Sequence, residues 1–404
     1  MGRIELIDTT LRDGQQSPLL FDTEKYKFTL AEKKLIARAL IKLGIKYIEL
    51  FSPIVGSAEA REFEELRLYI KSLDPEVMIL CHCRTNESDI ELALDAGFDG
   101  LNLFFGTSEH SIAGHGKSLD YIKDTVTKII SDLRKSRPEL YLRFSGEDAF
   151  RTELDTLYSV YDLVYELCDT FGTPDTVGTA TPDIVAHRIS TLKTRYPRIK
   201  IETHFHNDRG LAIINALTAV MNGADYVDTA VWGMAERSGI TSTTGILLNM
   251  DLTDSGFVSG YNLGNSYPLN ILLGSILDMQ VPYTEPVSLT NRTHIAGIHA
   301  KSVIKSSKVY EEIDLTKYGV STSQILLGPL SGWNLISYYL KEVLNYQLDE
   351  EQAKVITGIF KSKTHEIEHS RSPEVLLIEI AEEYGLKKLV VPKIFDDRRI
   401  ELLR

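Results

Sequence analysis

Two imidazoles stand two positions apart in the segment 200–210, which reads Lys-Ile-Glu-Thr-His-Phe-His-Asn-Asp-Arg-Gly. Alternation along a β-strand sends residues i and i+2 to the same face. If the intervening residues point outward, one inward face carries Glu202, His204 and His206, together with Asp208 if the strand continues. Two neutral nitrogen donors beside a carboxylate outline a divalent-metal site. The alternative is a pair of histidines that are satisfied as polar residues at a strand end.

A second polar segment, 8–16, reads Asp-Thr-Thr-Leu-Arg-Asp-Gly-Gln-Gln, where a strand runs into a glycine-containing turn. Asp13 could complete a metal set with His204 and His206 and leave positions open for a substrate, as a Lewis-acid catalyst requires. Arg12 is cationic at any working pH and suits a carboxylate or a developing alkoxide. The alternatives are an Asp that caps the turn and an Arg in a surface ion pair.

A third segment, Arg-Phe-Ser-Gly-Glu-Asp over 143–148, alternates polar and apolar side chains. Arg143, Ser145 and Glu147 therefore share one face, which is typical of an anion pocket. A salt-bridged strand end is the alternative.

Composition limits the classes of partner. The chain has 404 residues, 43% of them hydrophobic and 25% charged, which is ordinary for a globular protein. Its net charge of -13 argues against nucleic-acid binding, so an anionic substrate must be met by local Arg or Lys. Only three cysteines occur, Cys81, Cys83 and Cys168, which fits a reducing compartment. A thiolate metal site at Cys81 and Cys83 would lack the second cysteine pair that completes such a site. With no signal-peptide pattern and no long apolar run, we expect no membrane association and a cytoplasmic location.

Three segments share a helix, a glycine stop and then a strand, around Gly44, Gly97 and Gly223. Strands that alternate with helices imply a parallel sheet. Eight strand-helix units predict an α/β fold, a closed TIM (β/α)8 barrel, with a doubly wound open sheet as the alternative. The weakest strand is the sixth, which contains a Gly and a Pro. The predicted strands are 4–10, 47–53, 77–83, 100–106, 139–146, 170–176, 200–207 and 226–233.

The repeat stops near residue 275. We therefore predict a catalytic barrel over 1–275, a connector over 276–320 that carries His299 and Tyr310, and a mainly helical C-terminal subdomain over 321–404. Helical patterns cover 322–344, 348–362 and 373–386. A barrel places its active site at the C-terminal ends of its strands, where the polar segments above fall.

Taken together, the motifs resemble those of the homocitrate synthase and isopropylmalate synthase family of metal-dependent barrel enzymes. The similarity runs in order over about residues 4–340 and includes the segments above, Asp-Thr-Val-Gly-x-Ala-Thr-Pro, Gly-Met-Ala-Glu-Arg-Ser-Gly-Ile-Thr and Ala-Gly-Ile-His-Ala-Lys. The homocitrate synthase branch is the nearer one, judging by Phe-Asp-Thr-Glu-Lys at 21–25, His-Gly-Lys at 115–117 and Leu-Ser-Gly-Trp-Asn at 330–334.

The resemblance implies a role for each matching residue. A divalent metal ion (Mg, Mn or Zn) would bind Asp13, His204 and His206, and Arg12 would stabilise the alkoxide. Glu202, His299 and Tyr310 match acid-base residues, the last two entering from a partner subunit, which implies a homodimer with shared active sites. The substrate-binding set would be Gln16, Asn86, Arg143, Ser145 and Thr176.

The implied reaction is an acyltransferase reaction, the condensation of acetyl-CoA with a 2-oxo acid. The first choice is 2-oxoglutarate, which gives homocitrate and CoA. Asn86 appears where lysine-pathway members carry a His, and Arg209 and Ser238 also depart from the pattern, so 2-oxoisovalerate, pyruvate, oxaloacetate or phosphonopyruvate remain alternatives. A related acyl-CoA lyase would need a cysteine in the loop 233–239, which has none. The third alternative is a non-catalytic regulator.

Overall fold

A computed structural model describes residues 2–295, 302–303, 306–365 and 372–389. The chain divides into two compact units, one formed by Met1–Ser288 with Thr316–Val320 and the other by Leu289–Leu315 with Ser321–Arg404. The segment 276–320, which the sequence sets apart as a connector, is thus divided between both units.

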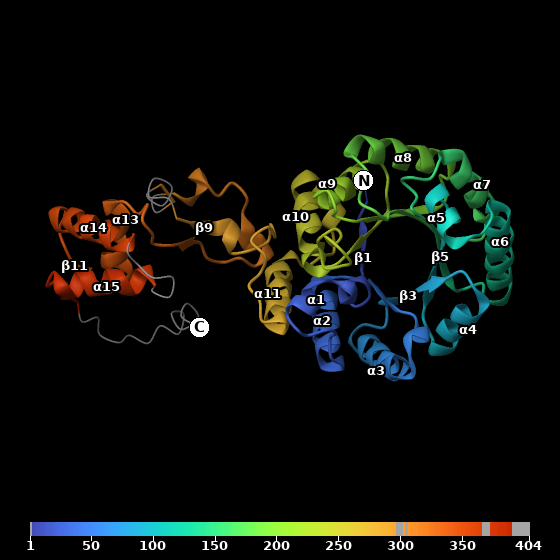
Figure 1. Cartoon of the computed structure of the whole chain (residues 1–404), viewed down its shortest axis with the longest axis horizontal. Helices are drawn as coiled ribbons and strands as arrows, with labels where there is room; N and C mark the ends of the chain where they lie inside the picture. The colour runs from blue at the N-terminus through green and yellow to red at the C-terminus, as the bar shows by residue number, and fades with distance from the viewer. Residues whose placement is uncertain (1, 296–301, 304–305, 366–371, 390–404) are drawn as a thin grey trace. The chain divides into compact units, whose positions relative to one another are not determined.

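The first unit is a closed barrel of eight parallel strands in the order β1 to β8, with helices in a ring outside them, as Figure 1 shows. This confirms the predicted TIM barrel and excludes the open sheet. The strands are β1 (Glu5–Asp8), β2 (Tyr47–Phe51), β3 (Met78–Arg84), β4 (Gly100–Gly106), β5 (Tyr141–Glu147), β6 (Thr170–Asp175), β7 (Lys200–Phe205) and β8 (Tyr226–Thr229). The helices are α1 (Leu19–Asp22), α2 (Leu30–Leu43), α3 (Ser57–Leu73), α4 (Glu87–Ala96), α5 (Glu109–His115), α6 (Leu119–Ser136), α7 (Leu154–Val164), α8 (Pro182–Arg195), α9 (Ala212–Met221), α10 (Thr243–Thr253) and α11 (Ser266–Leu277).

Helix α2 shows how local sequence sets the helix boundaries. Thr29 and Glu32 form a capping box at its start, in which the Thr29 hydroxyl accepts from the Glu32 amide and the Glu32 carboxylate accepts from the Thr29 amide. Gly44 ends the helix in the left-handed region at φ +104°. A Cβ there would lie 2.8 Å from the carbonyl oxygen of Gly260, so both conformation and space require glycine.

The barrel interior changes from apolar to charged along the strands. At the N-terminal ends, Ile7, Leu80 and Tyr226 form a buried cluster with three partly buried neighbours, among them Tyr47 and Tyr141. Two residues further along, the same faces of β2, β5 and β8 carry buried charged side chains, namely Glu49, Arg143 and Asp228. The apolar layer closes the bottom of the barrel, and the charged layer forms the floor of a cavity above it.

Strand β6, the weakest in sequence, owes its glycine to this cavity. A Cβ on Gly172 would lie 2.0 Å from the Ser145 hydroxyl and 2.6 Å from a Glu202 carboxylate oxygen. Glycine therefore makes room for the side chains of β5 and β7, and the loss of strand propensity is compensated by pairing on both sides.

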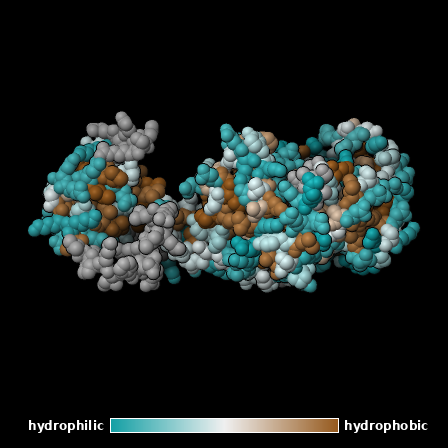
Figure 2. Space-filling view, turned by 90° about the horizontal axis from the view of Figure 1, so that it is seen from below, coloured by the Kyte–Doolittle hydropathy of each residue, from teal (hydrophilic) through white to brown (hydrophobic). Residues whose placement is uncertain are grey.

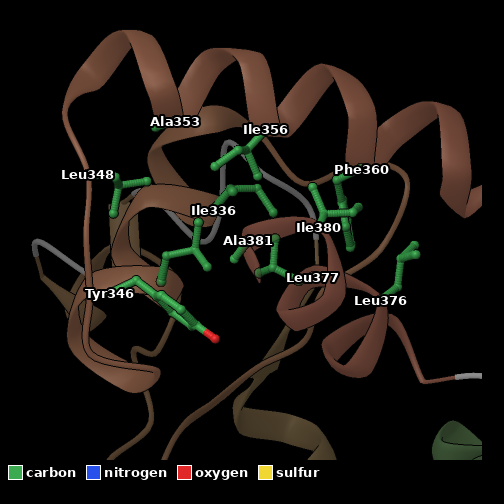
Figure 3. Close-up of a cluster of buried hydrophobic side chains, with 11 residues drawn as sticks. Ile336, Tyr346, Leu348, Ala353, Ile356, Phe360, Leu376, Leu377, Ile380 and Ala381 are labelled. Carbon is green, nitrogen blue, oxygen red and sulfur yellow. The ribbon is translucent and has the colours of Figure 1, made fainter. Parts of the chain in front are cut away.

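The second unit has an apolar helical core. Buried side chains from three helices point toward one another (Figure 3), and Ile336, Ile356, Phe360, Leu377 and Ile380 are at its centre. Its elements are β9 (Thr293–His294), β10 (Gln324–Ile325), α13 (Trp333–Tyr338), a π-helical turn (Tyr339–Val343), β11 (Tyr346–Gln347), α14 (Glu350–Thr364), α15 (Pro373–Glu383) and β12 (Lys387–Lys388).

The helix predicted over 322–344 is shorter than expected and begins at Trp333. Gly328, Pro329 and Gly332 interrupt the helical pattern, because glycine and proline both disfavour a helix interior. Residues 324–325 pair instead with β9 as a two-stranded parallel sheet.

The visible surface mixes hydrophilic and hydrophobic side chains, as Figure 2 shows. Among the described residues, no helix has the length and apolar content needed to cross a membrane. All three cysteines are free, and Cys81 and Cys83 are buried.

Candidate active site

A cavity of about 320 Å³ opens at the C-terminal ends of the barrel strands. This is the end at which TIM barrels carry their active sites. Its lining comprises Arg12, Asp13, Gln16, Phe51, His82, Asn102, Phe104, Arg143, Ser145, Glu147, Pro174, Thr176, Glu202, His204, His206, Asp228 and Glu236. The cavity therefore brings together nine of the site residues predicted from the sequence in the barrel, and leaves out Asn86.

Asp13, His204 and His206 form a buried cluster whose possible ligand atoms all lie within 4.8 Å of one another. His204 is on β7, His206 follows the strand end, and Asp13 begins the 3-10 turn after β1. The Nδ1 atom of His206 is buried without a hydrogen-bond partner among the described residues. Two imidazoles and one carboxylate with further space beside them fit a divalent metal ion with open positions.

The protonation of this cluster suits a metal ion. Burial lowers the pKa of His206 to about 3, which keeps the imidazole neutral. Burial alone would raise the pKa of Asp13, but Arg12 and the two histidines hold it below its usual value. A charged carboxylate and a neutral imidazole are the forms in which these side chains bind metals.

Arg12 lies beside this cluster and is held by two carboxylates. Its Nη1 atom is 3.3 Å from Oδ2 of Asp13, and its Nε and Nη2 atoms contact Oε1 of Glu49 at 3.0 and 2.9 Å. The guanidinium is therefore fixed at the edge of the candidate metal site rather than in a surface ion pair.

Arg143 lines the cavity and is buried beside three acidic side chains. It donates to Oε2 of Glu49 at 2.8 Å and to Oδ1 of Asp228 at 3.0 Å, and it lies 3.6 Å from Glu202. Burial alone would lower the pKa of Arg143, but these carboxylates raise it, so the residue stays charged. The sequence predicted an anion pocket here, and the structure shows that its cation, Arg143, already has three acidic partners.

His82 on β3 faces the cavity beside Arg143 and was not predicted as a site residue. The side-chain nitrogen of Asn102 lies 2.8 Å from Nδ1 of His82, and the ring stacks on Phe104. Burial, with the positive charges of Arg12 and Arg143, lowers the pKa of His82 well below its usual value. The neutral ring can donate from Nε2, because the amide nitrogen of Asn102 donates to Nδ1.

Asn86, the strand-three residue predicted to contact substrate, is instead the N-cap of α4. Its side-chain oxygen accepts from the Asp89 amide at 3.0 Å and from the Ser88 hydroxyl at 2.9 Å. Strand β3 ends at Arg84, so the chain has already turned into the helix when it reaches this residue. His82, four residues earlier and on β3, lines the cavity instead.

Two carboxylates of the cavity have different surroundings. Glu202 is fully buried, one of its oxygens has no hydrogen-bond partner among the described residues, and burial raises its pKa well above the usual value. Glu147, at the end of β5, is partly exposed; burial raises its pKa, and the His115 ring nitrogen 3.8 Å away opposes that shift. Such a pair can supply an acid and a base in one site.

The remaining predicted residues have simple positions. Gln16 is exposed at the cavity wall, Ser145 donates to the Asn102 side-chain oxygen at 3.0 Å, and the Thr176 hydroxyl accepts from the Asp148 amide at 2.9 Å. Tyr310 is an exposed residue of the second unit, next to Glu311. His299 lies outside the described residues.

Sequence reasoning gave no role to five other residues that line or border the cavity, namely Glu49, His82, Asn102, Asp228 and Glu236. The signal for three of them was a polar residue at an inward position of a largely apolar barrel strand: Glu49 on β2, Asn102 on β4 and Asp228 on β8. A buried charge at such a position is costly unless it is paired, which marks it as part of a site.

Comparison with known proteins shows the family to which this chain belongs. The HMGL-like family model matches residues 3–269, and the homocitrate synthase post-HMGL domain-like model matches residues 287–367. The chain therefore belongs to the HMGL-like family of barrel proteins, in the part of it that carries a homocitrate synthase-type domain after the barrel.

Relatives of known name share much of the chain. A mitochondrial homocitrate synthase of Schizosaccharomyces pombe is 35% identical over 88% of this chain and 83% of its own length. A cytosolic homocitrate synthase isozyme of Saccharomyces cerevisiae is 35% identical over 89% and 82%. A 2-isopropylmalate synthase of Pyrococcus furiosus is 31% identical over 89% and 72%.

Solved structures share the barrel. The hydroxymethylglutaryl-CoA lyase of Pseudomonas aeruginosa superimposes with a TM-score of 0.58 at 19% identity, over 69% of this chain and 94% of the lyase. The lyase of Brucella melitensis gives 0.56 at 20% identity, over 69% and 100%. At this identity the likeness concerns the fold alone.

Proposed function

We propose that this protein is an acyltransferase that condenses acetyl-CoA with a 2-oxo acid, most directly 2-oxoglutarate, to give homocitrate and CoA. The observation that carries the proposal is the cavity that brings a metal-type Asp-His-His cluster, Arg12 and Arg143 together at the C-terminal end of a TIM barrel. The homocitrate synthases among the relatives support the choice of acid, and the 2-isopropylmalate synthase supports the same chemistry on another 2-oxo acid.

Two groups of residues would bind the two ends of the 2-oxo acid, one at each end of the cavity. Asp13, His204 and His206 would hold a divalent cation, Mg, Mn or Zn, which when bound polarises the keto group of the acid. Arg12 beside them would stabilise the negative charge that develops on the keto oxygen. At the other end, Arg143, His82 and Ser145 would hold the distal carboxylate of the acid.

The condensation needs a base for the weakly acidic methyl group of the thioester. Glu202, His299 and Tyr310 are the residues that the family resemblance assigns to this work, and Glu147 is a further carboxylate of the cavity with a raised pKa. Loss of a methyl proton lets the methyl carbon bond to the keto carbon, and the resulting alkoxide takes up a proton. Water then cleaves the thioester and releases CoA.

The assignment is tested by following CoA release from acetyl-CoA with a thiol reagent. The panel comprises 2-oxoglutarate, 2-oxoisovalerate, pyruvate, oxaloacetate and phosphonopyruvate, each with chelator alone and with added Mn²⁺ or Mg²⁺. We expect metal-dependent release with 2-oxoglutarate. Release with another acid would change the substrate assignment and leave the proposed reaction type unchanged. No release with any acid would contradict the proposal.

We also propose a cytoplasmic homodimer in which His299 and Tyr310 act in the partner's cavity. The position of both residues after the barrel and the cytosolic relative support this. Mixing the inactive variants Asp13→Ala and Tyr310→Phe should restore about a quarter of the wild-type activity, because half of the chains then form mixed dimers with one complete site. Either variant mixed with itself is the control, and no restoration would contradict shared sites.

A further inference from the structure

Six charged or titratable side chains form a closed ring of contacts around the cavity floor. From Arg12 the ring passes to Glu49, Arg143, Asp228, His204 and Asp13, and back to Arg12. The contacts in that order measure 2.9, 2.8, 3.0, 3.2, 3.5 and 3.3 Å. The ring joins the candidate metal ligands to Arg143, which lies on another strand.

Asp228 is the member of the ring that joins these two parts. Its Oδ1 atom accepts from Nη1 of Arg143 at 3.0 Å, and its Oδ2 atom lies 3.2 Å from Nδ1 of His204. Only 1% of the residue is exposed, so water does not compete for these contacts. Oδ2 also accepts from Nη2 of Arg143 at 3.4 Å, so Asp228 contacts Arg143 with both oxygens and His204 with one of them.

The contact with His204 determines which ring nitrogen carries the proton. An ionised carboxylate only accepts hydrogen bonds, so Nδ1 of His204 must be the donor. The other ring nitrogen, Nε2, lies 3.5 Å from Oδ2 of Asp13. Nε2 is therefore the nitrogen of His204 that faces another member of the candidate metal cluster.

We propose that Asp228 is a positioning residue that holds His204 in the Nδ1-protonated form and so sets the affinity of the site for its metal ion. The inference rests on the proposed metal-dependent function. Outer carboxylates that accept from a metal-binding histidine orient the ring and raise its basicity. Asp228 also binds Arg143, so it ties the orientation of the metal ligand to the residue that would hold the distal end of the acid.

The first test is Mn²⁺ binding to the metal-stripped full-length protein, measured by calorimetry without substrate. Asp228→Asn should weaken Mn²⁺ binding about 10- to 100-fold, because an amide can donate to Nδ1 and move the ring proton to Nε2. Asp225→Asn is the matched control, since this neighbouring carboxylate binds Lys193 and Lys200 instead of a cavity residue. It should leave the Mn²⁺ affinity unchanged.

The outcomes separate this inference from the function. Unchanged affinity in Asp228→Asn, or an equal loss in both variants, would overturn the role of Asp228 and leave the proposed function intact. A wild-type protein that binds no Mn²⁺, Mg²⁺ or Zn²⁺ would overturn the metal site and this inference with it.

A measurement on the unaltered side chain guards against a variant that fails to fold. In protein labelled with ¹⁵N-histidine, a long-range ¹⁵N–¹H correlation distinguishes the two neutral tautomers, and His204→Gln identifies the signal. We expect His204 to be protonated at Nδ1 in the metal-free protein. A ring that is protonated at Nε2 alone would overturn the inference.

Discussion

The two units of the molecule have opposite interiors. The centre of the barrel holds acidic and basic side chains, Arg12, Glu49, Arg143 and Asp228 among them, whereas the centre of the second unit is an apolar cluster of side chains from its helices. The barrel can carry charge inside because its apolar contacts are made elsewhere, between the outer faces of the strands and the surrounding helices. Burial in the upper barrel interior therefore forms the candidate site, whereas burial in the second unit stabilises its fold.

The ring of ion pairs explains how the barrel tolerates this charge. A buried charge destabilises a protein strongly when its partner is removed, even where the intact pair contributes little. The contacts of Arg143 with Glu49 and Asp228 should therefore matter more for stability than any one apolar contact in the second unit.

The largest expected effect concerns activity. His206→Ala should lower kcat/KM by more than about a thousandfold, because it removes one of three candidate metal ligands. The thermal midpoint of the metal-free protein should hardly change, since the Nδ1 atom of His206 has no partner among the described residues. Steady-state kinetics and a thermal melt measure the two effects. A large drop in the melting temperature without loss of activity would mean that His206 serves stability and not the site.

Removal of the central cation should destabilise the barrel. Arg143→Met leaves Glu49 and Asp228 without this partner and should cost about 5 kcal/mol of unfolding free energy. The chain has two tryptophans, one in each unit, so Trp232 reports on the barrel in a Trp333→Phe background. Urea unfolding followed by this fluorescence measures the change. A loss below about 1 kcal/mol would mean that the ion pairs of Arg143 are not needed to hold the buried carboxylates.

The matching test in the second unit is a cavity. Phe360 is fully buried among apolar side chains of α13 and α15, and Phe360→Ala should cost about 4 kcal/mol. Trp333, which packs against this cluster, reports the change in a Trp232→Phe background. The Mn²⁺ affinity of the barrel should stay as in wild type. A fall in Mn²⁺ affinity together with the loss of stability would show that the two interiors are not independent.

The smallest predicted effect is a pH dependence. Burial raises the pKa of Asp8 from 3.8 to about 6, so the folded state binds a proton there that the unfolded state has released. Stability from this group is present below pH 4 and is lost as the pH rises to 6, by about 3 kcal/mol.

Asp8→Asn isolates this contribution, because the amide can still accept from the Thr10 backbone amide that contacts Asp8 at 2.9 Å. The stability of Asp8→Asn relative to wild type should increase between pH 4 and 6 and stay constant above. A difference that is flat over that range would refute the assignment.

The alternation of strand and helix patterns along the sequence predicted the barrel, and three glycine helix stops marked where strands begin. It also predicted the Asp13, His204 and His206 cluster, since those residues fall at strand ends and their family motifs are specific. Glu49, His82 and Asp228 were missed because one polar residue within a strand leaves no periodic signal. Their importance appears only when neighbouring strands bring them to Arg143.

Two expectations failed for local reasons. The family resemblance placed Asn86 in the substrate site, but β3 ends two residues earlier and the side chain caps α4. In the second unit, strands of two residues such as β9 and β10 are set by pairing between distant segments, which no local pattern records.

The identity of the product tests the proposed condensation most directly. Incubation of the full-length protein with Mn²⁺, 2-oxoglutarate and acetyl-CoA labelled with ¹³C in both acetyl carbons should yield homocitrate that carries both labels, as detected by mass spectrometry. Labelled acetate with unchanged 2-oxoglutarate would mean that the cavity only hydrolyses the thioester, and it would contradict the proposed condensation.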